Sequence, residues 1–453
     1  MEIKPILDPE FVPAVLWNRA FEQEAENSSV AVTIGLFRDD KIVAKRAVKV
    51  LADADRSFKY IERLLKTLLW AVGGNRILFA GPDELFQRLE KHYTESPVGR
   101  FDSEIIGEKI YDHAIRVEKE LAEDIPEPSA EGKALGRHLD GCRIGFDLGG
   151  SDRKCAALID GEVVFSEEIK WDPYFEKNPQ YHVAGIMDSL KRAAEHLPRV
   201  DAIGGSAAGV YVNNEVRVAS LFRGVAPEEF ETTVRPIFKQ IQKAWGSIPF
   251  DVVNDGEVTA LAGAMSLNDN AVLGISMGTS LAAGYVTPEG NITSWLNELA
   301  FVPVDYRANG PVDEWSGDAG CGVQFFSQQG VARLALLANL EFPADTPFAQ
   351  QLVEVQRLMS EGDERARKIY ETIGVCFGYT IAHFATLYDF RNLLILGRVT
   401  SGTGGQIIIE KAEEVLTAEF PALAAKVKIS TPDERMKRHG QAVAAASLPM
   451  IGE

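Results

Sequence analysis

The sequence has few cysteines, no long apolar run and less positive than negative charge, and each shortage excludes a class of protein. Four scattered cysteines among 453 residues suit neither a disulfide framework nor a metal site built from paired cysteines. No run reaches the roughly 18 apolar residues that indicate a membrane-spanning helix. With 47 lysines and arginines against 66 aspartates and glutamates, the net charge of -19 disfavours nucleic acid or anionic lipid as the main partner.

The composition that remains is typical of a globular protein, with 46% hydrophobic and 25% charged residues. The first residues, MEIKPILDPEF, have neither the basic start nor the apolar centre of a signal peptide. We therefore expect a cytoplasmic protein with reduced thiols and no membrane partner. A chain of 453 residues is longer than an ordinary single domain, so two or three domains are expected.

Residues 1–125 are predicted to form an α/β domain of their own. Val30–Val50 reads as a hairpin, and apolar residues recur at helical spacing after Ser57, a candidate helix cap. A strand at Arg76–Ala80 and a helix over Asp83–Tyr93 follow. No basic recognition helix of a helix-turn-helix unit is found here, which disfavours DNA binding.

A linker is predicted at residues 126–141. The surrounding stretch, DIPEPSAEGKALGRHLDG, has two prolines, several small residues and no apolar period, as linkers do. It separates the N-terminal domain from a first lobe at 142–270 and a second lobe at 271–453, whose C-terminal helix is expected to return to the first lobe. Strands alternate with helices in both lobes, which predicts α/β layers around a mixed, mainly parallel sheet. The expected elements include a helix over Gly185–His196, a largely helical segment over Pro227–Trp245 and a strand at Asn392–Leu396.

Each lobe begins with a strand, a glycine turn and a second strand. The first hairpin is RIGFDLGGSDRKCAALIDGEVV, residues 143–164, and the second is AVLGISMGTSLAAGYVTPEGNIT, residues 271–293. Glycine turns between central strands can direct backbone N–H groups at an anion. Gly149, Gly150 and Ser151 in the first turn and Gly278 and Thr279 in the second could close on one polyphosphate. Each turn alone is equally well an ordinary hairpin.

Two acidic residues are candidates for the chemistry. Asp147 precedes the first glycine turn and could hold Mg²⁺, which favours one or two carboxylates plus phosphate oxygens. In VVNDGEVTALAGAM, residues 252–265, an apolar strand ends at Asn254 and Asp255 and a helix follows. Asp255 could accept a proton from a hydroxyl nucleophile while Asn254 orients the substrate. The alternative is that Asp255 only caps the helix.

The order of these motifs resembles the actin/hexokinase/heat-shock ATPase superfamily, and within it the ROK family of repressors, open reading frames and sugar kinases. DLGGS at 147–151, ND at 254–255, GTS at 278–280 and LILGRVTSGTG at 394–404 occur in the order expected of the superfamily. AIGGSAAGVYV at 202–212, on the sugar side, and NELAFVP at 297–303 are also similar to the family. The resemblance covers residue 143 to the C-terminus. It implies an α/β fold of two actin-like, ribonuclease H-like lobes, with the N-terminal α/β domain added.

The resemblance also implies ATP-dependent phosphorylation of a sugar or sugar derivative in the cleft between the lobes. Asp255 would be the general base, and ATP with Mg²⁺ at Asp147 would be the cofactors. The substrate-binding residues would be Asn254, Glu298, Gly205 and Ser206. The nucleotide-binding residues would be Gly149, Gly150, Ser151, Lys154, Gly278, Thr279, Gly397 and Arg398.

The sequence departs from the family at its zinc loop and at its sugar-binding histidine. Ala319, Cys321 and Phe326 stand at the three cysteine positions, so no zinc is expected. Phe301 replaces the histidine, either as a core residue or as a ring that stacks on substrate. Two other functions therefore stay open: a non-catalytic sugar or nucleotide sensor, and an ATPase driven by a partner protein. The domain at 1–125 could be a decayed lobe or a dimerisation module, which leaves a homodimer open.

Overall fold

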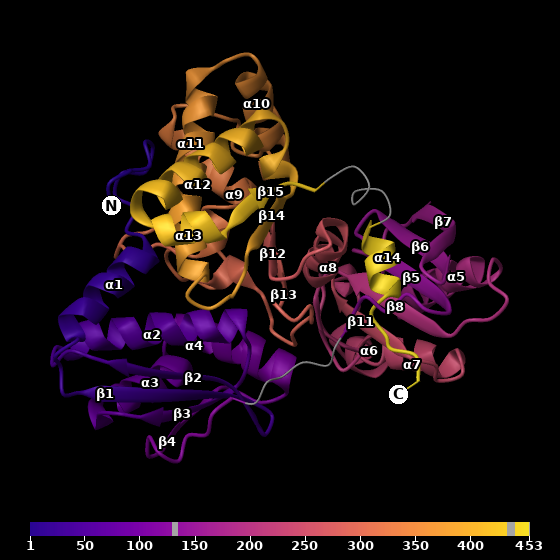
Figure 1. Ribbon diagram of the computed structural model, residues 1–453, viewed down its shortest axis with the longest axis horizontal. Coiled ribbons are helices and arrows are strands. Elements are labelled where there is room, and N and C mark those ends of the chain that lie inside the picture. The colour runs from indigo at the N-terminus through magenta and orange to yellow at the C-terminus, as the bar shows by residue number, and fades with distance from the viewer. Residues whose placement is uncertain (129–134, 433–439, 453) are drawn as a thin grey trace.

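The computed structural model describes residues 1–128, 135–432 and 440–452. Figure 1 shows three α/β parts: residues 1–125, here the N-terminal unit, a first lobe on the opposite side of the molecule, and a second lobe above the N-terminal unit. Residues 129–134, which belong to the predicted linker at 126–141, lie outside the described residues. Each part is built around its own sheet.

The N-terminal unit has a four-stranded sheet in the order β2-β1-β3-β4. The predicted hairpin is confirmed, but the predicted cap is not. The carboxylate of Asp53 accepts hydrogen bonds from the N–H groups of Asp55 and Arg56, both at 3.1 Å, whereas Ser57 is buried within the first turn. The elements are α1 (Ala14–Ala25), β1 (Ala31–Arg38), β2 (Lys41–Lys49), α2 (Ala54–Ala71), β3 (Arg76–Ala80), α3 (Asp83–Glu95), α4 (Pro97–Asp102), the π-helix η1 (Ser103–Ile110) and β4 (Arg116–Lys119).

The first lobe has a five-stranded mixed sheet in the order β11-β8-β5-β6-β7. The predicted helix from Gly185 begins earlier, at Pro179, because Asn178 caps it, and Pro236 separates two helical pieces that the sequence joined. The elements are β5 (Cys142–Leu148), β6 (Asp152–Ile159), β7 (Glu162–Lys170), α5 (Pro179–Ala194), β8 (Ala202–Ala207), β9 (Val210–Val212), β10 (Glu215–Val218), η2 (Ser220–Phe222), α6 (Pro227–Glu229), η3 (Phe230–Val234), α7 (Ile237–Ala244), β11 (Phe250–Asn254) and α8 (Asp255–Leu267).

The second lobe has a four-stranded sheet in the order β13-β12-β14-β15, with β12, β14 and β15 parallel. The strand predicted at Asn392–Leu396 is confirmed as β14. The elements are β12 (Val272–Met277), β13 (Leu281–Val286), η4 (Leu299–Phe301), η5 (Gly322–Gln324), α9 (Gln328–Leu337), α10 (Phe348–Ser360), α11 (Glu364–Phe384), β14 (Asn392–Leu396), η6 (Arg398–Thr400), α12 (Thr403–Glu419), α13 (Pro421–Lys426), β15 (Lys428–Ser430) and α14 (Gln441–Ala446).

Two helices lie between the lobes. The helix α8 follows β11 of the first lobe but packs on β12 and β13 of the second, and α14 packs on α8 and on β5 and β8. The approach of α14 explains a glycine in β5, since a Cβ at Gly145 would lie 1.8 Å from the carbonyl oxygen of Ala442. The start of α8 is thereby placed at the junction of the two sheets.

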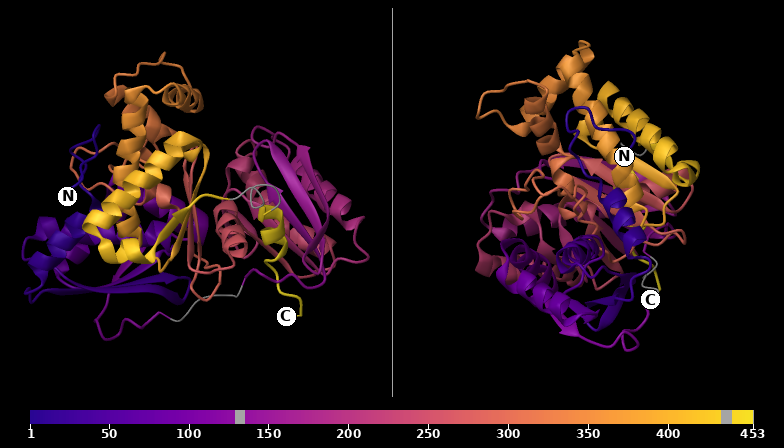
Figure 2. Two further views of the ribbon diagram at one scale, coloured as in Figure 1. Left: turned by 45° about the horizontal axis from the view of Figure 1, so that its top comes forward. Right: turned by 90° about the vertical axis from the view of Figure 1, so that its left-hand side faces the viewer.

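The N-terminal unit and the second lobe share one hydrophobic core. Apolar residues of α1, α2 and β1 belong to the same buried cluster as those of β12, α9 and α11, whereas the first lobe has a core of its own. The chain before α1 also pairs with the second lobe, because Ala14 N–H donates to Val304 (3.0 Å) and Tyr306 N–H to Val12 (2.9 Å). Figure 2 shows the N-terminal segment lying along the second lobe.

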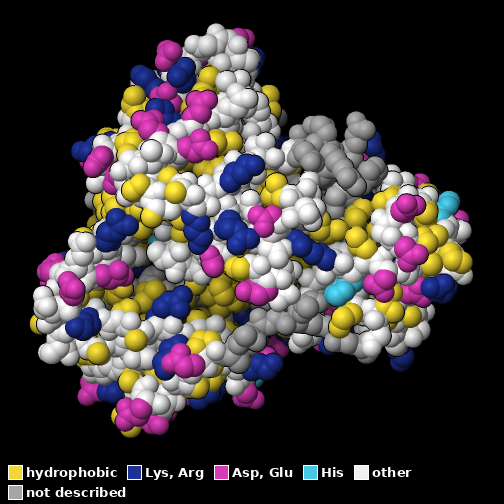
Figure 3. Space-filling view, in the orientation of Figure 1, with side chains coloured by type: hydrophobic (Ala, Val, Ile, Leu, Met, Phe, Trp, Pro, Cys, Tyr) yellow, Lys and Arg dark blue, Asp and Glu magenta, His cyan; other side chains and the backbone are white. Residues whose placement is uncertain are grey.

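The N-terminal unit meets the first lobe through charged groups. Asp112 forms ion pairs with Arg217 at 2.6 Å and with Arg235 at 2.5 Å. On the face seen in Figure 3, basic and acidic side chains are interspersed rather than gathered into a large area of one sign. None of the helices in the described parts of the chain is long and apolar enough to cross a membrane.

Candidate active site between the lobes

The first turn of α8 is fixed by Asn254, the last residue of β11. Its Oδ1 accepts a hydrogen bond from Gly256 N–H, and its Nδ2 donates to the carbonyl of Gly209, both at 2.7 Å. The helix cap is therefore Asn254, and Asp255 is the first helical residue. The amide of Asn254 ties the loop after β8 to the start of α8, so any contact it makes with a substrate adds to this structural role.

Asp255 lies in a setting that favours its protonated form. Burial and the charge of Asp147 raise the pKa of its carboxyl to about 6, although nearby backbone N–H groups counteract part of the rise. Asp147 itself accepts a hydrogen bond from Ser206 Oγ at 2.7 Å and lies 3.9 Å from Lys154 Nζ. Burial raises the pKa of Asp147 above its usual range.

A third carboxyl faces the same region from the second lobe. Burial and then the charge of Asp255 raise the pKa of Glu298 to about 7. The structure thus brings together Asp147 from β5, Asp255 from α8 and Glu298 from the segment before η4. Carboxyls with pKa values displaced towards neutrality are suited to proton transfer.

The first glycine turn lies at the end of β5. Gly149 N–H donates to the carbonyl of Asp152 at 2.9 Å, and Trp171 Nε1 donates to Gly149 at 2.7 Å. A Cβ at Gly150 would lie 2.0 Å from the hydroxyl of Tyr174, so any larger residue there would displace the end of this tyrosine from the turn. Ser151 is exposed beside them.

Lys154 lies between two carboxylates at this turn. Its Nζ is 3.9 Å from Asp147 and 3.6 Å from Asp152, so it offsets both negative charges next to the glycines. Arg153 points to the helix on the other side, where it pairs with Asp188 at 2.6 Å. Of the two basic residues that follow the turn, only Lys154 lies at the site.

The second glycine turn lies at the end of β12 in the second lobe. Gly278 N–H donates to Ser280 at 2.9 Å, and Thr279 is exposed. Gly397 follows β14 with φ of 100°, and a Cβ there would lie 2.4 Å from the carbonyl oxygen of Met277. Arg398 is exposed beside it. These residues lie together because β12 and β14 are parallel neighbours.

Gly205 and Ser206, predicted to bind substrate, lie inside the sheet of the first lobe. A Cβ at Gly205 would lie 2.2 Å from the ring of Phe146, and Ser206 is fully buried. The hydrogen bond from Ser206 Oγ to Asp147 makes it a positioning residue for that carboxylate. Direct contact with a substrate stays a prediction for both.

The segment that contains Phe301 is held by the N-terminal unit. The last carbonyls of α2 accept hydrogen bonds from Leu296, Asn297 and Glu298 N–H, and the last of these joins Glu298 to Trp70 at 3.0 Å. The ring of Phe301 lies 4.2 Å from that of Trp70 and 5.6 Å from that of Phe101, centroid to centroid. Of the two interpretations of Phe301, this contact favours the packing one.

The loop at the position of the family's zinc site carries a buried ion-pair cluster instead. Asp318 pairs with Arg63 at 2.9 Å and with Lys66 at 3.1 Å, both from α2. Cys321 is buried beside them, and burial raises the pKa of its thiol to about 12. In the described ranges, no three His, Cys, Asp or Glu side chains gather in a way that could hold a metal ion.

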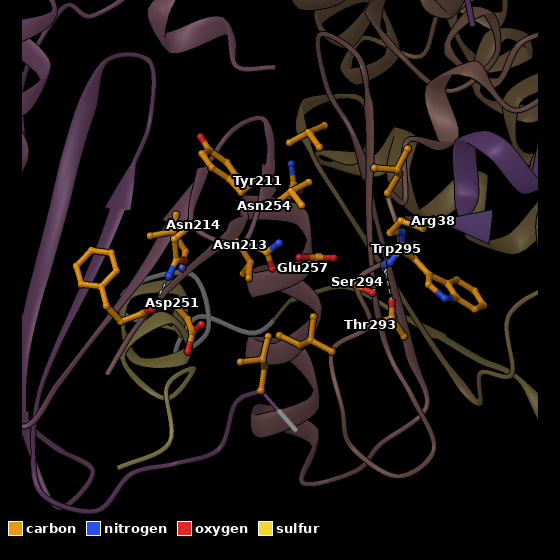
Figure 4. Close-up of a pocket in the computed structure, with 18 of the residues that line it drawn as sticks. Arg38, Tyr211, Asn213, Asn214, Asp251, Asn254, Glu257, Thr293, Ser294 and Trp295 are labelled. Carbon is orange, nitrogen blue, oxygen red and sulfur yellow. Dashed lines mark hydrogen bonds between the residues drawn. The ribbon is translucent and has the colours of Figure 1, made fainter. Parts of the chain in front are cut away.

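A cavity of about 1110 Å³ opens beside Asn254, and the sequence did not indicate it (Figure 4). It runs along β11 between the β9–β10 hairpin on one side and residues 292–296 on the other. Glu257 lies on its α8 wall, and burial raises the pKa of this carboxyl to about 8. The turn between β1 and β2 of the N-terminal unit also lines it, a long-range contact that no local pattern encodes.

Comparisons with known proteins place the fold. No protein-family model and no curated protein sequence matches the chain. A ROK hexokinase from Thermus thermophilus is similar in structure with a TM-score of 0.53 and 18% identity, over 67% of this chain and 96% of the hexokinase. A ROK family transcriptional regulator, a homologue of the E. coli MLC protein, has a TM-score of 0.51 and 18% identity, over 68% of this chain and 78% of the regulator. The two-lobed fold predicted from the motifs is confirmed: this chain has the actin-like fold of ROK proteins, with an N-terminal unit in addition.

Proposed function

We propose that the chain transfers the terminal phosphoryl group of ATP to a hydroxyl of a sugar or sugar derivative. The observation that carries the proposal is the half-buried Asp255 at the junction of the two lobes, where desolvation and the charge of Asp147 raise the pKa of its carboxyl to about 6. A group with this pKa is largely ionised at neutral pH, yet it is basic enough to accept a proton from a hydroxyl. The similarity of the fold to a ROK hexokinase is consistent with this function.

Each of the neighbouring residues has a role in the proposal. Asp255 removes the proton of the attacking hydroxyl, and Glu298 and Asn254 hold the sugar. Asp147, oriented by Ser206 and flanked by Lys154, fits a hydrated Mg²⁺, because one carboxylate plus phosphate oxygens is the usual set for this ion. Bound Mg²⁺ would supply charge neutralisation on the phosphates.

The two glycine turns would bind ATP from both lobes. Gly149, Gly150 and Ser151 would line the phosphates from the first lobe, and Gly278 and Thr279 would line them from the second. The N–H groups of Gly149 and Gly278 close their own turns, so the donors would be the N–H groups of Gly150, Ser151 and Thr279. Gly397 and Arg398 would lie against the adenosine. Because the turns belong to different lobes, closure of the lobes would bring both onto the phosphates and exclude water, the competing acceptor.

A second candidate function is a sugar or nucleotide sensor without turnover. It is favoured by Phe301, which packs on Trp70 of the N-terminal unit at 4.2 Å where the family's sugar-binding histidine is expected. It is also favoured by Tyr174, whose hydroxyl lies against Gly150 in the first turn.

The test is ADP release from Mg-ATP across hexoses, N-acetylhexosamines and polyols, with the native protein and Asp255→Asn. We expect turnover with a sugar and a loss of about 10²–10⁴-fold in the variant, while ATP binding measured by calorimetry is retained. ATP binding without turnover on any sugar would identify a sensor. ADP release that ignores sugars and responds to a protein would identify a partner-driven ATPase.

A further inference from the structure

The cavity beside Asn254 has walls from all three parts of the molecule. Glu257 forms its α8 wall, and the β9–β10 hairpin and β11, which ends at Asn254, form the first-lobe wall. Residues 292–296 form the second-lobe wall. The turn at residues 38–41 closes it from the N-terminal unit. Its volume of about 1110 Å³ is slightly above the roughly 300–1000 Å³ of clefts that hold drug-sized ligands, and exceeds what one hexose fills.

The wall from the N-terminal unit is fixed in place. The guanidinium of Arg38 donates hydrogen bonds to the carbonyl of Val72, at 2.5 Å, and to Ser294 Oγ. The turn between β1 and β2 is thus tied to the segment of the second lobe that forms the opposite wall. The same end of α2 accepts a hydrogen bond from the backbone N–H of Glu298. The turn and Glu298, the candidate sugar-binding residue, are therefore both held by the end of α2.

The first-lobe wall is equally well held. Asn214 donates from Nδ2 to the carbonyl of Phe250 at 2.6 Å and accepts at Oδ1 from Val252 N–H at 2.8 Å, which fastens the hairpin to β11. The contact between Asn254 and Gly209 joins this wall to the residue next to Asp255. One end of the cavity is therefore lined by Asn254, the residue that precedes the candidate catalytic Asp255.

The lining suits a neutral polyhydroxylated ligand. The lining carries the acidic side chains of Asp39, Asp40 and Asp251 against the basic side chains of Arg38 and Lys41. Glu257 is mainly neutral at pH 7, because burial raises the pKa of its carboxyl to about 8. The lining therefore has no excess of positive charge that would attract an anionic ligand. Carboxyl and amide groups donate to and accept from hydroxyls. Tyr211 and Trp295 are half-buried, and Trp295 is braced by Tyr285 and Tyr388, at 5.8 and 5.4 Å between ring centroids. Braced rings of this kind pack against the C–H face of a pyranose.

We propose that the cavity holds a second, neutral sugar unit of the acceptor, with the reacting unit at Asp255. The acceptor is then a disaccharide or larger saccharide, and the N-terminal unit forms the wall that recognises its outer unit. This inference rests on the proposed phosphoryl transfer and goes beyond it by naming the class of acceptor. Figure 4 shows the polar side chains of the two lobes facing each other across the space in which that unit would lie.

The test measures kcat/KM for hexoses and for the matching disaccharides with the full-length native protein, with Asp40→Trp and with Glu90→Trp. Asp40 is exposed in the turn and lines the cavity, so an indole there fills the space for the outer unit. Glu90 is an exposed acidic residue of α3 that does not line it. Its variant controls for the introduction of a surface tryptophan.

We expect at least one disaccharide to exceed its hexose in kcat/KM by about tenfold or more. In Asp40→Trp this preference falls by about tenfold or more, and in Glu90→Trp it is unchanged. A hexose that is used as well as every disaccharide, or a preference that survives Asp40→Trp, overturns the inference while phosphoryl transfer stands. If no saccharide is phosphorylated, the proposed function itself fails and the inference falls with it.

Discussion

Asp255 and Glu257 belong to the same turn of α8, yet their surroundings give them different acidities. The pKa of Asp255 is raised to about 6 by burial and by Asp147, whereas that of Glu257 is raised to about 8, chiefly by burial. At neutral pH the first is mainly ionised and the second mainly protonated. One can accept a proton and the other can donate a hydrogen bond, a division of roles that follows from environment alone.

The pH dependence of activity follows from Asp255. A general base must be ionised, so we expect kcat/KM for the best acceptor to fall as the pH drops through about 6, the pKa of this carboxyl. The measurement is a pH–rate profile between pH 5 and 8 at saturating Mg-ATP. A profile that stays flat down to pH 5 would contradict the assignment of Asp255 as the base.

The buried carboxyl of Glu257 makes a separate prediction about stability. Its pKa is about 8 in the folded protein against 4.5 ordinarily, so between these values the folded state binds more protons than the unfolded state. Its contribution therefore decreases stability as the pH rises through that interval. We expect Glu257→Gln to lose less thermal stability than the native protein between pH 5 and 8. Parallel curves of Tm against pH would contradict the assignment.

At the scale of elements, α2 holds the second lobe by its side chains and by its end. Lys66 is almost fully buried and pairs with Asp102 at 3.0 Å and with Asp318 at 3.1 Å. The indole N–H of Trp70 donates to Asp102 at 2.9 Å. The last turn of α2 accepts the backbone N–H groups of residues 296–298. The helix thus positions Glu298 although it lies outside the region that resembles ROK proteins.

Removing the charge of Lys66 should strongly destabilise the folded protein. Lys66→Met leaves Asp102 and Asp318 buried without their ammonium partner, and we expect a loss of about 3–5 kcal/mol in the free energy of unfolding. Arg56 lies in the first turn of the same helix and forms an exposed ion pair with Glu24 of α1. Arg56→Met breaks this pair and is expected to change the free energy of unfolding little. Urea denaturation of the three proteins checks this, and equal losses in both variants would contradict it.

The sequence could predict the elements whose causes are local. Neighbouring residues determine the strand–turn–strand hairpins, the strand at Asn392–Leu396 and the junction of Asn254 with Asp255. The structure confirms these elements. The sequence indicated Ser57 as the helix cap, whereas the cap is Asp53, four residues earlier. Both side chains can accept hydrogen bonds from the first N–H groups of a helix. The contacts of Arg38 with Ser294 and of Trp70 with Phe301 join segments more than 200 residues apart. No periodicity or motif encodes such contacts.

At the scale of the whole molecule, the N-terminal unit and the second lobe act as one body. Their apolar residues form one continuous cluster, while the first lobe is joined to them through α8, α14 and the ion pairs of Asp112. Movement of the first lobe against this body is the closure that the proposed reaction needs. The body would carry Glu298 and the turn at residues 38–41 with it.

The shared core predicts the result of truncation. A chain that lacks residues 1–125 exposes the apolar surface of the second lobe that α1 and α2 cover, so we expect an insoluble or unfolded product. Solubility and circular dichroism of the truncated and full-length chains check this. A soluble truncated protein that unfolds cooperatively would show that the N-terminal unit is dispensable for the fold.

The most direct test of the central claim is to identify the product that receives the phosphate. The protein is incubated with Mg-ATP and the best acceptor from the saccharide panel, and sugar phosphate, ADP and inorganic phosphate are quantified by ³¹P NMR. The account predicts one sugar phosphate for each ADP, and neither above background with Asp255→Asn. ADP accompanied by inorganic phosphate at the same rate with or without saccharide would contradict it, because the protein would then be an ATPase.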